Sequence, residues 1–206
     1  YKNGNFNSLI LSDGTKIRET LESAFKPQFA ENMDIKICNY CDRHCPYCHE
    51  GSSEEGGFAD IMGEEFINSL HPYQEIAIGG GDVTSHPDLV PFLGKLKILK
   101  VIANITINQI HFEQKYDFIK SLVDKGLIHG LGISIVRADE GFIKKVSEFP
   151  NAVIHVINGV LDKMTCNLLL DHNIKILILG YKELRRGNEW IKANKFEVSS
   201  NKLWLK

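Results

Sequence analysis

Three cysteines in one short stretch are the residues of this chain best suited to chemistry. Cys41, Cys45 and Cys48 have the spacing C-x3-C-x2-C within residues 41 to 48. This spacing allows one loop to hold three corners of an iron–sulfur cube. A four-iron four-sulfur cluster normally takes four thiolates, so three ligands leave one iron open to another molecule, as catalytic zinc sites keep an open position. The spacing therefore predicts a cluster with one reactive iron.

A fourth cysteine, Cys38, leaves a second interpretation open. Cys38-x2-Cys41 followed by Cys45-x2-Cys48 also has the form of a zinc site with four thiolates. Paired zinc knuckles are usually separated by about a dozen residues or more, whereas only three lie between Cys41 and Cys45. Cys38 also ends an apolar run, where a free cysteine commonly packs as a small apolar residue. We therefore predict that Cys38 is not a ligand.

The cysteine loop resembles the cluster-binding loop of radical S-adenosylmethionine (SAM) enzymes. It follows a short predicted strand, and Tyr47 precedes the last cysteine, where an aromatic residue fits that family. The resemblance implies a [4Fe-4S] cluster on Cys41, Cys45 and Cys48, with SAM at the open iron and Tyr47 beside it. It also implies reductive cleavage of SAM to a 5'-deoxyadenosyl radical that abstracts hydrogen from a substrate. The substrate and the catalytic residues are not identified by the sequence.

A run of glycines ends the next predicted strand. It consists of Gly79, Gly80 and Gly81, and Asp82 follows it. Glycine lets a ligand approach the backbone closely, and the run is neither G-x-G-x-x-G nor a P-loop, which disfavours phosphate binding. In radical SAM proteins a Gly-Gly-Glu motif at this place receives the amino group of the cofactor. Asp82 stands for the usual Glu, so we expect a backbone contact more than a carboxylate contact, and we expect a side chain at Gly80 to obstruct SAM.

The resemblance places further residues at the cofactor. Asn108, at the end of the third predicted strand, and Ser134, near the end of the fourth, are expected to bind the ribose or the methionine carboxylate. Asn158, after the fifth strand, is expected to border the adenine together with Val156 and Gly159.

The elements that position these residues follow a regular alternation. From residue 33 onward, short β-branched runs alternate with helical patterns, which is typical of a parallel sheet built from βα units. We predict strands near 33 to 38, 75 to 79, 100 to 108, 131 to 136, 152 to 158 and 174 to 180, and helices near 63 to 70, 87 to 98, 112 to 125, 139 to 148 and 162 to 172.

Six strands define the expected fold class and domains. A complete TIM barrel needs eight βα units and typically about 250 residues, so an α/β partial (βα)6 barrel is expected, as in many radical SAM enzymes. Residues 6 to 17 carry a turn between apolar runs. We therefore divide the chain into a hairpin-like N-terminal extension, 1–32, and a radical SAM partial-barrel domain, 33–206.

The third predicted strand alternates polar and apolar residues. Asn104, Thr106 and Asn108 fall on one face because the side-chain period of a strand is two. Strands of a helix-covered parallel sheet are normally apolar throughout, so this face predicts a polar, ligand-holding barrel interior. Gly132 and Ser134 repeat the pattern on the fourth strand. The alternative, that these polar groups only satisfy one another, stays open because buried polar groups are hydrogen-bonded whatever their role.

Charged and titratable residues offer weaker candidates. His155, on the fifth strand, is suited to proton transfer near neutral pH if it lies in the interior, although a satisfied core histidine is the simpler interpretation. Lys182, Arg185 and Arg186 follow the sixth strand, at the face where barrel active sites lie. They suit either an anionic substrate or a solvated charged tail.

Composition limits the partners. The 206 residues are 43% hydrophobic with a net charge of -2, which suits one well-formed core and argues against a broad nucleic-acid surface. No run approaches the roughly twenty apolar residues of a membrane helix, so no membrane partner is expected. Four of the five cysteines lie within residues 38 to 48, which favours metal binding in a reducing cytoplasm over disulfides.

Substrate and redox partners follow from the resemblance. No second cysteine cluster follows Cys48, whereas many peptide-modifying radical SAM proteins carry auxiliary clusters. A small molecule or nucleotide is therefore the favoured substrate, with a protein substrate or partner enzyme left open, and an electron donor such as flavodoxin or ferredoxin is implied. The alternative functions are a non-enzymatic zinc or iron–sulfur binding module, and a barrel of this family that has lost catalysis.

Overall fold

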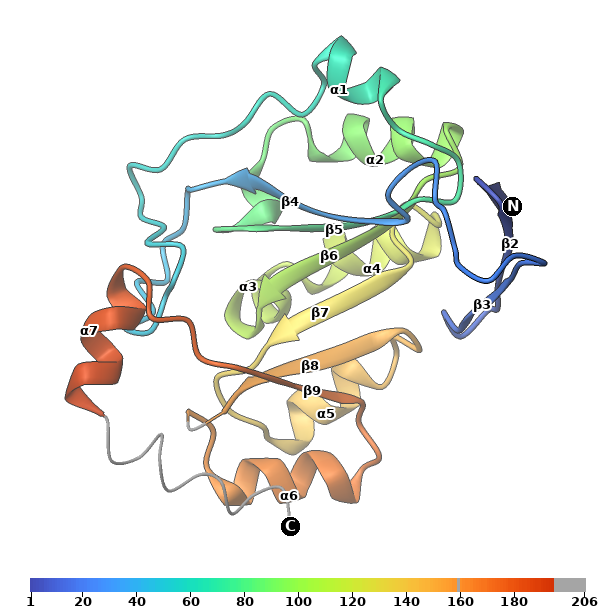
Figure 1. Cartoon of the computed structure of the whole chain (residues 1–206). Helices are drawn as coiled ribbons and strands as arrows, with labels where there is room; N and C mark the ends of the chain where they lie inside the picture. The colour runs from blue at the N-terminus through green and yellow to red at the C-terminus, as the bar shows by residue number, and fades with distance from the viewer. Residues whose placement is uncertain (159, 195–206) are drawn as a thin grey trace.

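A six-stranded parallel sheet forms the centre of the molecule. The computed structural model describes residues 1–158 and 160–194 (Figure 1). The strands run in the order β4-β5-β6-β7-β8-β9, and each neighbouring pair is parallel. Their bounds are β4 Asn32–Cys38, β5 Glu75–Gly80, β6 Ile102–Asn108, β7 Gly130–Ser134, β8 Ala152–Ile157 and β9 Ile176–Leu179. The predicted α/β partial barrel of six strands is confirmed.

Helices between the strands cover the outer face of the sheet, and one further helix, α7, follows the last strand. They are α1 Glu64–Asn68, α2 Leu89–Ile98, α3 Gln109–Gln114, α4 Tyr116–Asp124, α5 Glu140–Val146, α6 Lys163–Asp171 and α7 Arg186–Ala193, with a 3-10 turn η1 at Val83–Ser85. The helix predicted over residues 112 to 125 is instead two helices, because the chain leaves helical geometry at Lys115 (φ -114°, ψ 27°). The longest described helix, α2, has 10 residues, and no described helix can cross a membrane.

The two faces of each strand meet different surroundings. In β6, Ala103, Ile105 and Ile107 are buried, whereas the alternating Asn104 and Thr106 are only half-buried. The buried face packs on the helices in one continuous apolar core. Because burial of apolar surface is the main favourable term in folding, this alternation turns the apolar residues outward to the helices. The polar residues consequently line the inside of the partial barrel, as predicted.

The N-terminal residues form a small antiparallel sheet at the edge where the barrel strands begin (Figure 1). It contains β1 Lys2–Asn3, β2 Phe6–Ile10 and β3 Lys16–Glu19. Leu11 N donates to Thr15 O at 2.9 Å across the turn between β2 and β3. A cavity of about 490 Å³ separates this turn from the strand starts, with Asn104 and Lys175 in its wall. The hairpin thus lies at the end of the barrel opposite the cysteine loop; the domain boundary at residue 32 stays a prediction.

Candidate cluster and cofactor site

The cysteine loop leaves the barrel at the carboxyl end of β4. Its backbone is fixed by Cys41 N, which donates to Ser53 O at 2.9 Å, and by Cys48 N, which donates to Cys45 O at 3.1 Å. Cys41, Cys45 and Cys48 are half-buried free thiols. Barrel active sites lie at this carboxyl edge of the strands, so the fold brings the predicted ligands to the expected end.

The three thiols lie close enough to influence one another. Burial raises the pKa of Cys45, and the charges of Cys48 and Cys41 raise it further. Burial likewise raises the pKa of Cys41, with a smaller contribution from Cys48. Three neighbouring thiolates are unfavourable without a compensating cation. Soft thiolates are the ligands of iron–sulfur clusters, so this donor set fits such a cluster.

Cys38 differs from the other three in its surroundings. It is 3% exposed at the end of β4, and its thiol donates to Tyr40 O at 3.9 Å. Burial raises its pKa to about 11, although a hydrogen bond with the Gly81 backbone opposes this rise. A packed thiol engaged with backbone groups supports the prediction that Cys38 is not a ligand.

A histidine from α3 joins the cysteine loop to the segment after the glycines. His111 Nε2 lies 2.7 Å from Asp42 Oδ1, and His111 Nδ1 lies 3.6 Å from Asp82 Oδ1. Hydrogen bonds from Arg43 and then His111 hold the pKa of Asp42 well below its usual range. Cys41 Sγ, an Asp42 oxygen and a His111 nitrogen lie within 4.8 Å of one another, a grouping that is able to hold a single metal ion.

The Asp82 carboxylate is buried and hydrogen-bonded to neighbouring residues of the chain. Its carboxylate accepts hydrogen bonds from Lys115 Nζ at 2.8 Å, Ser85 Oγ at 2.5 Å and Thr84 N at 3.1 Å. Burial opposes ionisation, but the hydrogen bonds from Lys115, Ser85 and Thr84 lower its pKa. With 3% of the residue exposed, the carboxylate caps η1 and pairs with Lys115. The cofactor contact expected at this position is thereby left to the backbone.

The glycines at the end of β5 serve different purposes. Gly80 has a φ of +132°, and a Cβ there would lie 2.5 Å from Cys38 O. A Cβ on Gly81 would lie 2.0 Å from Tyr40 O. Both positions therefore require glycine for packing against the chain around Cys38, so obstruction of SAM is not the first expected effect of a side chain at Gly80. At Gly79, by contrast, a Cβ would meet no described atom within 4 Å, which leaves open space toward the barrel interior.

Three predicted residues lie side by side on neighbouring strands. Asn108 is in register with Ser134, and Ser134 is in register with His155. Asn108 Nδ2 donates to Cys45 Sγ at 3.9 Å, and burial lowers the pKa of His155. With about 4.8 Å between neighbouring strands, these side chains form a polar wall that begins beside the cysteine loop and crosses the barrel interior.

Gly132 in β7 makes room for this wall. A Cβ there would lie 2.6 Å from His155 Cε1 and 2.9 Å from Thr106 Oγ1. The imidazole and the hydroxyl therefore occupy the space above one glycine. His155 is one of the half-buried residues of β8 that face the barrel interior, and it is not part of the apolar core.

Of the three residues expected near the adenine, the structure describes Val156 and Asn158. Val156 is 3% exposed and its side chain belongs to the core, so only its backbone is available to a ligand. Asn158 follows β8, and its N–H donates to Leu179 O at 3.0 Å. Gly159 lies outside the described residues. The cofactor roles of Asn158 and Ser134 stay predictions.

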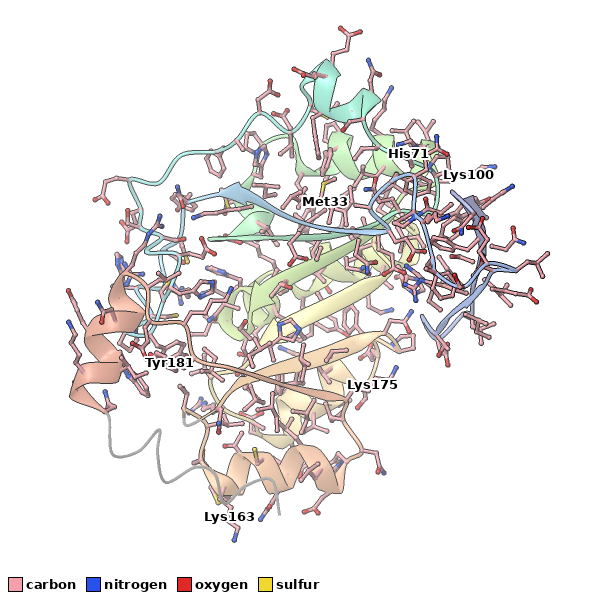
Figure 2. All side chains as sticks on the ribbon, in the orientation of Figure 1. Met33, His71, Lys100, Lys163, Lys175 and Tyr181 are labelled. Atoms are coloured by element: carbon pink, nitrogen blue, oxygen red, sulfur yellow. The ribbon has the colours of Figure 1, made fainter. Side chains whose placement is uncertain are left out.

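Helix α7 is the main feature that sequence analysis missed. It lies beside the cysteine loop (Figure 1), and its first residue, Arg186, donates from Nε to Cys45 O at 3.1 Å. Tyr181, which Figure 2 shows on the segment that leads into α7, stacks on Trp190 with 4.9 Å between ring centroids. Trp190 also meets Tyr47 edge to face at 6.2 Å. Arg186 is therefore a partner of the loop, neither a solvated charge nor a free anion site. The one signal in the sequence that could have revealed this helix is Trp190, a large aromatic residue in a mostly polar stretch.

Comparison with known proteins identifies the fold. The sequence matches no protein family and no curated protein. The structure is similar to Streptococcus suis SuiB bound to precursor peptide SuiA (TM-score 0.57, 18% identity), to SuiB alone (0.56, 19%) and to SuiB bound to S-adenosylmethionine (0.53, 17%). Each match covers 81% of this chain but only 45% to 46% of SuiB.

At this level of identity the likeness shows a shared fold. The chain shares its six-stranded α/β partial-barrel fold with SuiB, which one of these structures shows bound to S-adenosylmethionine. It spans less than half the length of SuiB.

Proposed function

We propose that this chain is a radical SAM enzyme or the barrel domain of one. It would hold a [4Fe-4S] cluster on Cys41, Cys45 and Cys48 and bind SAM across the carboxyl ends of the strands. The observation that carries the proposal is the gathering of three half-buried thiols at that edge of a barrel whose fold is shared with SAM-bound SuiB. When bound, the cluster supplies the electron for cleavage of SAM to a 5'-deoxyadenosyl radical, chemistry that belongs to the cofactor.

The residues of the chain would bind and orient. The open space at Gly79 receives the methionine end of SAM, with backbone groups of residues 79 to 82 as its polar contacts. The Asn108 amide orients Cys45 through its hydrogen bond to the sulfur. Ser134 and Asn158 would contact the remainder of SAM. Tyr47 packs the loop against Trp190 and in this way keeps its shape.

A polar substrate is proposed because Thr106 and His155 line the barrel interior next to the proposed SAM position. The sequence favours a small molecule or nucleotide. The precursor peptide bound by SuiB adds a peptide as the second substrate class for this fold. Reductive cleavage consumes an electron, so a donor such as flavodoxin or ferredoxin is part of the proposal.

Anaerobic reconstitution tests the proposal. The protein should take up four irons and four sulfides per chain and, once reduced, convert SAM to 5'-deoxyadenosine and methionine, separated by chromatography. Cys45→Ala should lose both properties, whereas Cys166→Ala, a matched change in α6 far from the loop, should keep both. A fully loaded protein that binds SAM yet yields no 5'-deoxyadenosine with any strong reductant would exclude the radical reaction.

A zinc-binding module is the second candidate, because Cys41, Asp42 and His111 are grouped closely enough for one metal ion. Asp42 and His111 are hydrogen-bonded to each other, however, and this contact occupies the groups that a metal would need. Metal analysis separates the candidates. One zinc per chain, with no iron or sulfide after anaerobic purification, would support the module and contradict the enzyme.

A further inference from the structure

Helix α7 contacts the cysteine loop through a charged residue that the proposed function does not use. Arg186 Nε donates to Cys45 O at 3.1 Å, and Arg186 Nη2 donates to Ser52 O at 2.9 Å. The rigid guanidinium fork is able to hold two carbonyls at once, which a lysine ammonium on its flexible stem does less well. Cys45 O also accepts from Cys48 N. Arg186 therefore joins the backbone at Cys45, a predicted ligand, to the backbone at Ser52, which follows the last cysteine of the loop.

Other contacts keep α7 in this position. Trp190 lies between Tyr47 of the loop and Tyr181. A Cβ on Gly187 would lie 2.4 Å from Lys182 O and 3.4 Å from Tyr47 O, so the helix approaches the chain too closely for a side chain there. The helix is thus packed on the loop at several points, and the Arg186 contacts are not those of a free surface side chain.

We propose that Arg186 is a positioning residue for the cluster: from α7 it holds the cysteine loop in its ligand-binding shape and places a fixed positive charge beside Cys45. The proposal rests on the proposed function. Net charge and hydrogen bonding around a cluster set its reduction potential. A nearby cation favours the reduced, more negative form. Arg186 should therefore both slow cluster loss and raise the reduction potential.

The test compares Arg186→Met, Arg186→Lys and a control, Arg18→Met. The control makes the same charge change in β3, at the far end of the barrel. In the metal-free proteins, hydrogen–deuterium exchange of the amides in residues 41 to 53 should quicken in Arg186→Met and stay at the wild-type rate in Arg18→Met. Unchanged exchange in Arg186→Met would overturn the positioning role.

In the reconstituted proteins, Arg186→Met should lose iron to a chelator at least about fivefold faster, the smallest factor expected for the loss of two hydrogen bonds. Its midpoint potential, followed by electron paramagnetic resonance, should become more negative. Arg186→Lys keeps the charge and loses the fork, so it should restore the potential but not the iron retention. Iron loss and potential equal to those of Arg18→Met would overturn the proposal.

These results separate the two hypotheses. If the wild-type chain takes up no cluster while Arg186→Met still loosens the loop, the proposed function fails and the bracing of the loop by α7 stands. If the wild-type chain takes up the cluster and Arg186→Met behaves as the control does, the proposed function stands and the role of Arg186 fails.

Discussion

The side chain of Asn108 joins a predicted cluster ligand to a helix. Its Nδ2 donates to Cys45 Sγ at 3.9 Å, while its Oδ1 accepts from Ile110 N at 2.9 Å and so caps α3. One amide therefore links the sulfur to the end of β6 and the start of α3. These two contacts have different energetic consequences, and substitutions can separate them.

Asn108→Ser should keep the cap and remove the amide donor, since serine is a good N-cap with a shorter side chain. We expect wild-type stability and a more negative cluster potential, because hydrogen bonds to the sulfurs raise the potential. Asn108→Ala should lose both contacts and destabilise the fold by about 1 kcal/mol. Denaturant unfolding and a redox titration measure the two effects. An Asn108→Ser cluster with the wild-type potential would contradict the role of the sulfur contact.

The ligand set is tested by single substitutions of the cysteines. Cys41→Ala, Cys45→Ala and Cys48→Ala should each abolish the cluster, whereas Cys38→Ala should bind it, because the Cys38 thiol is buried and engaged with backbone groups. Iron and sulfide analysis after anaerobic reconstitution provides the measurement. Equal cluster loss in Cys38→Ala would show four protein ligands and leave no iron for SAM.

Gly79 is the sharper probe of the cofactor position. Gly79→Val places a side chain in the open space toward the barrel interior, so it should weaken SAM binding by about tenfold or more while the cluster stays intact. Gly80→Val, at a φ of +132° and against Cys38 O, should instead disturb the loop and reduce cluster content. Calorimetry with SAM on protein of known iron content distinguishes the two. Unchanged affinity in Gly79→Val would place SAM elsewhere.

Asp82 should matter for stability more than for chemistry. Asp82→Asn should destabilise the fold by roughly 1–3 kcal/mol because it weakens a hydrogen-bonded buried group, and the value stays moderate since 31% of the Lys115 side chain is exposed. The folded pKa of Asp82 is lowered, so its contribution is present above the unfolded value of 3.8 and is lost as the pH falls through the folded pKa.

The measurement is the free energy of unfolding of both proteins between pH 7 and pH 3. The difference between wild type and Asp82→Asn should be constant near neutrality and shrink at the acid end. A difference that grows on acidification would contradict this assignment. Asp88→Asn, at the start of α2 without a side-chain cap, serves as the matched control and should change stability little.

The sequence alone determined the features that depend on neighbouring residues. The strand alternation in residues 102 to 108 predicted a polar and an apolar face because side-chain direction follows local backbone geometry. The short spacing of Cys41, Cys45 and Cys48 predicted one loop with three thiols, because residues so near in sequence can lie in one loop. Six β-branched runs that alternate with helical patterns predicted the parallel partial barrel, and the structure has it.

Only the tertiary structure decided which distant groups meet. Arg186 reaches Cys45 across 141 residues, and Lys115 reaches Asp82 across 33. Gly80 is glycine because Cys38 O lies against it, which no local pattern shows. Such contacts depend on how strands and helices pack in three dimensions and on which charges burial brings together. A periodicity of two or 3.6 residues carries no information about them, so the loop was predictable and its supports were not.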